Sequence, residues 1–354
     1  MTENVIVRRE NGVGRLTLNR PDALHALDQA MCETMLDALR AWASDPDIAI
    51  VMIDHAEETR GFCAGGDIRM LAESGAGNGE AARQFFATEY RLNTAIHNFP
   101  KPYLAIMDGV TMGGGVGVSV HGSHRVATER TLFAMPETGI GLFPDVGGGW
   151  FLPRLQGELG TWLALTGARL KGADVAAAGI ATHFVPSELI ANLKSQIVGA
   201  DFSTGAAELL GEILKGAAHA IPAGSFEPNI ETLNQCFAHA GVEAIVDALK
   251  ADASDWAVKQ VETLATKSPR TLKVALRQLR EGRDLSTFEE NMINEYRIGA
   301  RQVCSDDFLE GVRAVIVDKD HDPKWAPATL EGVGEDVLDA VFAPLPAGEE
   351  LTLP

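Results

Sequence analysis

The spacing of apolar residues predicts that the chain opens with strands and helices in alternation. Two β-rich runs, VIVRRE and VGRLTLN, lie within residues 5–19 and are separated by Asn11-Gly12, a pair typical of tight hairpin turns. A helix is expected after Asp28, which can cap its first turn, because apolar side chains then recur at helical spacing: Met31, Met35, Leu39 and Trp42. The run IAIVMID, from Ile48, is uniformly apolar and predicts a strand buried on both faces.

Further strand and helix units are predicted before residue 187. A helix fits residues 81–98, and a buried strand, YLAIM, begins at Tyr103. A glycine run then opens a short helix, and the strand-like segments HRVAT and LFAM lead into an irregular loop over residues 136–153. Such alternation indicates an α/β layered fold.

Beyond residue 187 the strand pattern ends, and the rest of the chain is predicted to be helical. Residues 222–228, bounded by prolines, are expected to form a linker, and Ser268-Pro269 begins a long amphipathic stretch. After Leu330 the chain carries six acids and no Lys or Arg, which predicts a frayed tail.

Composition narrows the class of protein. With 354 residues, the chain can build one large domain or two modest ones. Its 46% hydrophobic and 22% charged residues match soluble globular proteins. The net charge of −19 argues against a nucleic-acid partner, because such surfaces need clustered Lys and Arg. No run of 18 uncharged apolar residues occurs, so a membrane partner is not expected either.

The cysteines and the N-terminal sequence predict a cytoplasmic protein. Four cysteines are scattered without metal-ligand spacing, which fits a reducing compartment. The first residues, MTENVIVRRENG, lack the basic and apolar regions of a secretory signal.

Two glycine clusters are the first candidates for chemistry. Gly65-Gly66 and the run from Gly113 to Gly117 each follow a predicted buried strand and precede a helix. Backbone N–H groups in such turns can face a ligand, and two of them on one oxygen would form an oxyanion hole. The alternative is that both clusters are only tight turns or close strand–helix packings.

A second candidate is the pair of acids Glu137 and Asp145 in the loop MPETGIGLFPDVGGGW. Both follow a proline, and the loop is rich in large apolar residues, which suggests that it folds over something. Acids in apolar surroundings have raised pKa values and suit acid–base work near neutral pH. The alternative is that one acid caps a helix and the other closes a turn.

Other chemistries lack their motifs. There is no complete G-x-G-x-x-G and no Gly-Lys pair of a P-loop, so nucleotide chemistry is not expected. No G-x-S-x-G nucleophile motif occurs. The histidines form no H-x-x-x-H or H-E-x-x-H pair, so no metal site is predicted.

Taken together, these segments resemble the crotonase (enoyl-CoA hydratase/isomerase) superfamily over nearly the whole chain. The resemblance rests on NRPDALHAL, GFCAGGDI, KPYLAIMDGVTMGGGVGVSV and FAMPETGIGLFPDVGGGWFLPRL, which stand in family order. AGGDIR, MPET followed by FPDVGGG, LTGARLKG and GIATHFV are most similar to the branch that hydrolyses 3-hydroxyisobutyryl-CoA in valine degradation.

The resemblance implies a fold and its boundaries. Residues 1–195 would form a spiral of repeated ββα units that holds the active site, and residues 196–354 a helical region that covers it. The implied partner is a small acyl-CoA molecule, with coenzyme A as part of the substrate and no separate cofactor. A monomer, trimer or hexamer is compatible with this scaffold.

The resemblance also implies catalytic roles. Gly66 and Gly114 would donate two N–H groups to the thioester oxygen. Glu137 would act as nucleophile or as general base toward water; a covalent acyl anhydride and simple water activation both stay open. Asp145 would hold the substrate hydroxyl or assist the leaving thiolate, and Glu89 would contact the substrate.

Coenzyme A would lie with its adenine near Leu24 and Ala26 and its pantetheine along Ala64. Asp67 and Ile68, which follow the first glycine turn, are further expected substrate contacts. His25 stands where the family more often has asparagine.

One departure from the family separates two reactions. Hydratases carry a first catalytic glutamate three residues after the oxyanion glycine, and this chain has Gly117 there. Asp145 stands where hydratases tend to have glycine. The expected reaction is therefore hydrolysis of 3-hydroxyisobutyryl-CoA, or of the smaller 3-hydroxypropionyl-CoA, and the alternative is an enoyl-CoA hydratase or isomerase.

Overall fold

The computed structural model describes residues 3–56 and 59–353. The chain forms two compact units that interleave along the sequence: Met1–Gly66, Arg91–Phe133 and Leu170–Ser225 make the first, and Asp67–Tyr90, Ala134–Arg169 and Phe226–Pro354 the second. This division differs from the single boundary that was predicted at residue 195, because segments distant in sequence pack together.

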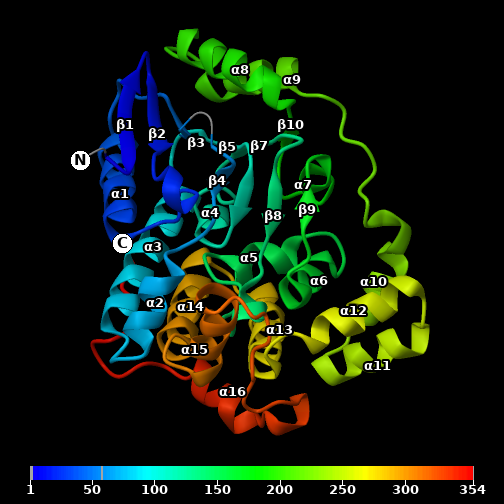
Figure 1. The fold of residues 1–354 in the computed structure, drawn as a ribbon. Coiled ribbons are helices and arrows are strands. Elements are labelled where there is room, and N and C mark those ends of the chain that lie inside the picture. The colour runs from blue at the N-terminus through cyan, green and yellow to red at the C-terminus, as the bar shows by residue number, and fades with distance from the viewer. Residues whose placement is uncertain (1–2, 57–58, 354) are drawn as a thin grey trace. The chain divides into compact units, whose positions relative to one another are not determined.

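The first unit contains a six-stranded sheet (Figure 1). In spatial order its strands are β1 (Val5–Glu10), β2 (Val13–Leu18), β3 (Ile50–His55), β5 (Tyr103–Met107), β7 (His124–Ala127) and β10 (His183–Phe184). β1 pairs antiparallel with β2, and the other neighbours run parallel. All residues of β3 and β5 are buried, as was predicted from their apolar runs, and the polar Asp54 and His55 at the end of β3 are buried with them.

A second, four-stranded sheet has the order β4 (Gly61–Cys63), β6 (Val110–Met112), β8 (Leu132–Ala134) and β9 (Leu170–Lys171). Successive strands alternate between the two sheets: β3, β5 and β7 belong to the large sheet, and the strands that follow them, β4, β6 and β8, belong to the small one. This repeated use of two strands and a helix confirms the predicted ββα repeat.

Local signals explain how the first unit begins. Asn11 and Gly12 have φ angles of +48° and +81°, as the tight turn between β1 and β2 requires. Asp28 caps α1 (Gln29–Ala43) by accepting a hydrogen bond from the backbone N–H of Met31. Both features confirm the sequence prediction.

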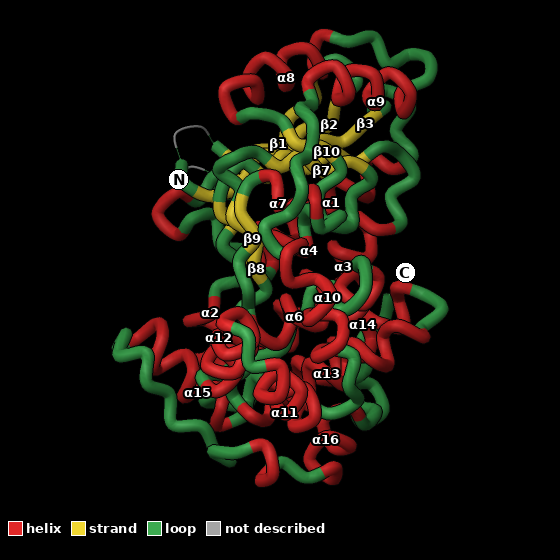
Figure 2. The backbone as a smooth tube through the Cα atoms, turned by 90° about the vertical axis from the view of Figure 1, so that its right-hand side faces the viewer, coloured by secondary structure: helices red, strands yellow, loops and turns green. Residues whose placement is uncertain are grey.

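Helices complete the first unit: α1, α4 (Gly114–Gly117), α7 (Ala173–Ala177), α8 (Ser187–Gly199) and α9 (Ala206–Ala217). Figure 2 shows α8 and α9 lying over the strands of the large sheet. Leu193, Ile197 and Leu210 from these helices join Ile50 and Leu104 of the sheet in one buried cluster. Burial of this apolar surface holds the two helices on the sheet.

The second unit is built of helices and loops (Figure 2). Its helices are α2 (Ile68–Gly75), α5 (Gly148–Phe151), α6 (Leu159–Thr166), α10 (Ile230–Phe237), α11 (Val242–Asp252), α12 (Asp255–Ala265), α13 (Pro269–Asp284), α14 (Phe288–Gln302), α15 (Asp306–Val312) and α16 (Glu335–Phe342). α3 (Glu80–His97) starts in this unit and continues into the first. Ser268 caps α13 with Pro269 in its first turn, as predicted.

The prediction of a frayed tail is wrong. Residues 335–342 form α16, and Leu351 is buried near the end of the chain. Glu350 pairs with Arg297 of α14 at 3.0 Å. Glu350 therefore binds a helix that is distant in the sequence, and the charge pattern near Glu350 did not reveal that partner.

Candidate active site

The two glycine turns lie at the same edge of the small sheet. β4 and β6 are parallel neighbours, so the segments that follow them, Ala64 to Gly66 and Gly113 to Gly117, leave the sheet at one end. Gly65 has a φ of +116°, and a Cβ atom there would lie 3.7 Å from the nitrogen of Gly114. The sequence prediction that these two turns belong together is consistent with this contact.

The N–H groups of these turns remain available to a ligand. The backbone N–H groups of Gly66 and Gly114 donate no hydrogen bond to any acceptor among the described residues. Gly114 is the first residue of α4, where a helix leaves its N–H groups unpaired and carries partial positive charge. Two such donors are what an anionic thioester oxygen needs.

Glycine is required where α4 approaches β4. A Cβ atom on Gly115 would lie 2.3 Å from the carbonyl oxygen of Cys63. Gly113 adopts φ +46° and ψ −122°, a conformation that side chains disfavour. The glycine run therefore lets the helix start directly against the neighbouring turn.

The segment around Leu24 lies along the first glycine turn. The N–H of Ala64 donates to the carbonyl of Leu24 (3.0 Å), and the N–H of Leu27 donates to the carbonyl of Gly65 (2.7 Å). Leu24 is exposed, and Arg20 Nη1 holds the carbonyl of Ala26 at 2.9 Å. The structure thus brings together the positions predicted to contact coenzyme A in this unit.

His25, the departure noted in this segment, faces inward. Its ring accepts a hydrogen bond from the N–H of Arg20 at Nδ1 (2.9 Å), and Nε2 lies 3.0 Å from Thr59 Oγ1. Burial, with a smaller effect of His55, lowers the pKa of His25 to about 4. His25 is therefore a neutral structural residue, and its backbone, like that of Leu24, adopts a left-handed φ.

The predicted acids gather in the second unit. Glu89 in α3, Glu137 in a short 3-10 helix (Glu137–Ile140) and Asp145 before α5 are all at most 5% exposed. Tyr90 donates its hydroxyl to Asp145 Oδ2 at 3.0 Å. Glu89 Oε1 and Glu137 Oε2 are buried and have no hydrogen-bond partner within residues 3–56 and 59–353. Acids left incomplete in this way are suited to receive a polar ligand.

Burial is the main cause of the pKa shifts in this cluster. It raises the pKa of Asp145 to about 7, against the opposing hydrogen bond from Tyr90. Burial also raises the pKa of Glu137 well above its usual range, and the neighbouring charge of Asp145 adds to that shift. Burial, then Asp145 and Glu295, raise the pKa of Glu89 in the same way. Carboxyl groups with such pKa values can donate and accept protons near neutral pH.

Sequence reasoning missed two members of the cluster, Tyr90 and Glu295. Tyr90 follows Glu89 and gave no motif of its own. Glu295 is fully buried on α14, and burial raises its pKa to about 8. A usable signal was present in α14, because Asn291 and Glu295 stand four residues apart among apolar positions that face inward.

The remaining predicted contacts cap a helix. Asp67 accepts a hydrogen bond from the N–H of Met70 at 3.4 Å, and Ile68 begins α2. Both belong to the second unit, whereas Gly66 belongs to the first. That the glycine turns and the acids act on one substrate stays a prediction.

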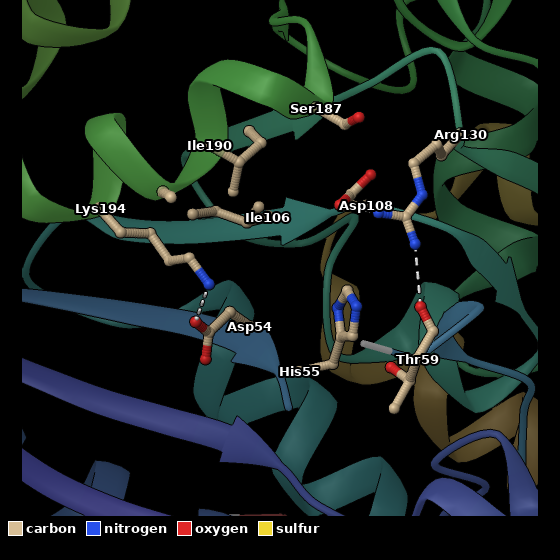
Figure 3. Close-up of a pocket in the computed structure, with 10 residues that line it drawn as sticks. Asp54, His55, Thr59, Ile106, Asp108, Arg130, Ser187, Ile190 and Lys194 are labelled. Atoms are coloured by element: carbon tan, nitrogen blue, oxygen red, sulfur yellow. Dashed lines mark hydrogen bonds and ion pairs between the residues drawn. The ribbon is translucent and has the colours of Figure 1, made fainter. Parts of the chain in front are cut away.

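The first unit also holds a polar cavity of about 200 Å³ at the ends of β3 and β5 (Figure 3). Its charges are already paired: Lys194 binds Asp54 at 2.9 Å, and Arg130 binds Asp108 at 3.2 Å. The cavity includes none of the predicted site residues.

Metal-ligand geometry is not found in the part of the chain that the structure describes: no three His, Cys, Asp or Glu side chains are grouped to hold an ion. The prediction that no metal or separate cofactor takes part stays a prediction.

Comparison with known proteins decides the family. Residues 13–342 match the enoyl-CoA hydratase/isomerase family. The chain belongs to this family. Among curated members, a Danio rerio protein named "3-hydroxyisobutyryl-CoA hydrolase, mitochondrial" is 48% identical over 346 residues, which cover 96% of this chain and 90% of that protein. Further vertebrate members with 45–48% identity have the same name.

Solved structures of the enoyl-CoA hydratase/isomerase family share the fold. One, titled a carnitinyl-CoA dehydratase from Mycobacterium thermoresistibile, is 40% identical with a TM-score of 0.93 and covers 99% of both chains. Another, titled an enoyl-CoA hydratase from Rhodobacter sphaeroides, is 37% identical with a TM-score of 0.89 and covers 99% of this chain and 100% of its own. The predicted crotonase-type fold is confirmed.

The prediction of a cytoplasmic location is wrong, because the similar vertebrate family members are named mitochondrial proteins. The error lies in the step from reduced cysteines to the cytoplasm. Cys32, Cys63, Cys236 and Cys304 form no disulfide among the described residues, but thiols are compatible with any reducing compartment. As for membranes, none of the helices within the described ranges has the length and apolar character to cross a bilayer.

Proposed function

We propose that this protein hydrolyses the thioester of 3-hydroxyisobutyryl-CoA. The name of its vertebrate relatives supports this activity at 45–48% identity over about 95% of the chain. The observation that carries the proposal is that Glu137 and Asp145 are both buried and lie close enough for the charge of Asp145 to raise the pKa of Glu137. The first hydratase position, in contrast, is Gly117 and carries no acid.

In this proposal the glycine turns polarise the thioester. The carbonyl oxygen accepts hydrogen bonds from the backbone N–H groups of Gly66 and Gly114. Neither N–H group donates to another acceptor among the described residues. As the carbonyl carbon becomes tetrahedral, charge builds on that oxygen. Each donor removed from such a site costs about 3–4 kcal/mol of transition-state stabilisation.

The acids then divide the proton work. Burial raises the pKa of both acids, and the charge of Asp145 raises that of Glu137 further. These shifts favour a state in which one of the two acids is protonated while the other is ionised. The ionised member takes a proton from the attacking water, or it attacks the carbonyl carbon itself and forms an acyl anhydride that water then hydrolyses. The protonated member gives its proton to the sulfur of coenzyme A as the C–S bond breaks, so the products are the free acid and the free thiol.

Glu89 is proposed to hold the 3-hydroxyl group of the acyl chain. It is buried, its Oε1 has no partner within the described residues, and burial raises its pKa, which favours the protonated form. A hydroxyl group can both donate to and accept from such a carboxyl group. This contact would favour 3-hydroxyacyl groups over plain acyl groups, because losing it leaves a buried polar atom unpaired.

The second candidate function is hydration of an enoyl-CoA. The titles of the two similar solved structures, a dehydratase and a hydratase, favour it. Gly117 argues against it, because this residue lies buried within α4 and provides no carboxylate for the addition of water across a double bond.

A substrate comparison separates the two functions. The protein is incubated with 3-hydroxyisobutyryl-CoA, 3-hydroxypropionyl-CoA and crotonyl-CoA, with free thiol and enoyl absorbance recorded in each case. Thiol release from a hydroxyacyl thioester is expected. Loss of enoyl absorbance from crotonyl-CoA without thiol release would replace hydrolysis by hydration.

The role of Glu137 is tested by Glu137→Gln. Turnover should fall by at least about 10³-fold while binding of coenzyme A, measured by calorimetry, stays nearly unchanged. Glu158→Gln is the matched control, because Glu158 is a buried acid of the same unit that is bound to Arg280 and Arg283. Unchanged turnover in Glu137→Gln would remove Glu137 from the mechanism.

The proposed reaction needs water and the thioester only. Activity should therefore survive dialysis against a strong metal chelator, and a loss that Zn²⁺ or Mg²⁺ restores would show a metal requirement.

Light scattering on the purified protein distinguishes a monomer from a trimer or hexamer, the assemblies considered for this scaffold.

A further inference from the structure

Glu295 binds the loop that carries Asp145. Its Oε2 accepts the backbone N–H of Gly147 at 2.7 Å, and its Oε1 accepts the N–H of Gly149 at 2.9 Å. The amide groups of Asn291 and Gln278 donate to the same Oε1 at 2.9 and 3.1 Å. Because the side chain is fully buried and four donors occupy its oxygens, Glu295 has no atom left for a substrate.

The loop has a conformation that needs outside support. Val146, directly after Asp145, has a φ of +51°, and Gly147 follows with +89°. A β-branched residue is rarely found in this region, because its side chain crowds the backbone. Such a conformation persists only where the surroundings fix it.

Contacts on both sides of Asp145 come from one network. Gln278 Nε2 donates to the carbonyl of Pro144 at 2.8 Å as well as to Glu295. The N–H of Gly148 donates to the carbonyl of Asp145 at 2.8 Å. The residues before and after Asp145 are therefore fixed by buried groups of α13 and α14.

Two glycines, Gly149 of α5 and Gly282 of α13, allow α13 and α14 to lie close to α5, which follows the loop. A Cβ atom on Gly149 would lie 2.5 Å from Asn291 Oδ1, and one on Gly282 would lie 2.0 Å from the carbonyl of Gly149. This close approach brings the Glu295 carboxyl group within hydrogen-bond distance of the N–H groups of Gly147 and Gly149.

We propose that Glu295 is a positioning residue that fixes the backbone of the Asp145 loop, and with it the direction of the Asp145 carboxyl group. The four donors favour the ionised form of Glu295 and oppose burial, which favours the protonated form. In the ionised form the side chain accepts a hydrogen bond from both N–H groups at once. A glutamine would direct its NH₂ group at one of them, which leaves two donors facing each other. This inference rests on the proposed function for the role of Asp145, but the support of the loop can be measured without any substrate.

The first test compares Glu295→Gln with Glu350→Gln. Both are Glu→Gln changes: Glu295 belongs to α14, whereas Glu350 binds Arg297 of the same helix and the N–H of Leu345, away from the loop. Glu295→Gln should lower kcat about 100-fold with KM changed less than about threefold, because misdirecting a reacting group affects the chemical step. Glu350→Gln should leave kcat within about twofold. Equal effects of the two variants would overturn the proposal.

A second variant tests the reason for the support. Glycine adopts a left-handed φ without cost, so Val146→Gly should recover about tenfold of the kcat that Glu295→Gln loses. A double variant no better than Glu295→Gln alone would show that the conformation of Val146 is not what Glu295 maintains.

Hydrogen exchange separates this inference from the proposed function. In Glu295→Gln the amides of residues 143–150 should exchange at least about tenfold faster than in the wild type, whichever thioester the protein cleaves. Unchanged exchange would overturn the positioning role even if hydrolysis is confirmed. If Glu295→Gln does not fold, Gln278→Met tests the same network: kcat should fall about tenfold, and an unchanged kcat would contradict the proposal.

Discussion

Tyr90 donates its hydroxyl group to Asp145 Oδ2 at 3.0 Å, and both side chains are buried. This hydrogen bond stabilises the ionised form of Asp145 and opposes the effect of burial, which raises the pKa of Asp145 to about 7. Tyr90 keeps its proton throughout the neutral range, because burial raises its own pKa well above the usual value. The pair is thus a fixed donor and a titrating acceptor.

Tyr90→Phe should therefore move the pH dependence of catalysis. Without the donor, the ionised form of Asp145 loses support and its pKa rises. We expect the limb of the kcat–pH profile near pH 7 to shift upward by about 1–2 pH units, since a hydrogen bond to a charged group is worth roughly 1.5–3 kcal/mol. Initial rates between pH 5 and 9 measure the shift.

Tyr103→Phe is the control for this measurement. Tyr103 is equally buried, but its hydroxyl donates to the backbone carbonyl of Val118 and to no carboxylate. Its profile should keep the wild-type position on the pH axis. A Tyr90→Phe profile that does not move would mean that Asp145 does not set that limb.

Gly115→Ala should separate the two glycine turns. The added methyl group would lie 2.3 Å from the carbonyl oxygen of Cys63, so α4 must move away from β4. Because Gly114 begins α4, its N–H would move as well, and kcat should fall by about 100-fold. Gly211→Ala in α9 is the control, since no atom of the described residues lies within 4 Å of its added methyl group.

The control should gain stability while Gly115→Ala loses it. Alanine is favoured over glycine within a helix by roughly 0.5–1 kcal/mol, so Gly211→Ala should raise the free energy of unfolding by about that amount. Full activity in Gly115→Ala would contradict the assignment of the oxyanion donors.

Sequence alone predicted the parts of this fold that depend on neighbouring residues. Asn11-Gly12 and Asp28 act within three residues of themselves, so their turn and cap could be recognised directly. The buried acids Glu137 and Asp145 were also found, because the apolar residues around them are close in sequence.

Long-range partners could not be predicted. Glu295 binds Gly147 across 148 positions, and Glu350 binds Arg297 across 53. The helical spacing of α14 places Glu295 on its inward-facing side, but nothing near Glu295 in the sequence identifies Gly147 as its partner. The division into two interleaved units escaped prediction for the same reason, since it depends on which distant segments pack together.

Stability should fall as the pH rises from 5 to 8. The pKa of Asp145 rises from 3.8 to about 7 on folding, so the folded protein holds this proton more tightly than the unfolded chain. Its stabilising effect is complete below about pH 3.8 and is lost progressively up to about pH 7, by roughly 3 kcal/mol between pH 5 and 8. Glu89 and Glu137 act in the same direction.

Asp145→Asn removes this titration. Urea unfolding at pH 5, 6, 7 and 8 should show a flatter dependence for the variant, and its advantage over the wild type should grow with pH. Parallel curves would show that the proton on Asp145 is not linked to folding.

Lys194→Met tests how α8 is held to the large sheet. Lys194 Nζ lies 2.9 Å from Asp54 Oδ2 at the end of β3 (Figure 3). Asp54 also binds Arg15 and Thr17. Burial disfavours the charge on Asp54, but Lys194 and Arg15 more than offset it and lower its pKa. Since Arg15 and Thr17 remain, the loss in unfolding free energy should be about 1–2 kcal/mol at pH 7.

The stability that the Lys194–Asp54 ion pair provides should increase with pH, whereas the stability linked to the proton on Asp145 decreases with pH. Stability from the lowered pKa of Asp54 is present above its ordinary pKa of 3.8 and is lost as the pH falls further, so the difference between variant and wild type should shrink in acid. Lys215→Met, at an exposed position of α9, should change stability by less than about 0.5 kcal/mol. A loss for Lys194→Met that is the same at pH 3 and pH 7 would mean that α8 is held by apolar packing and not by this ion pair.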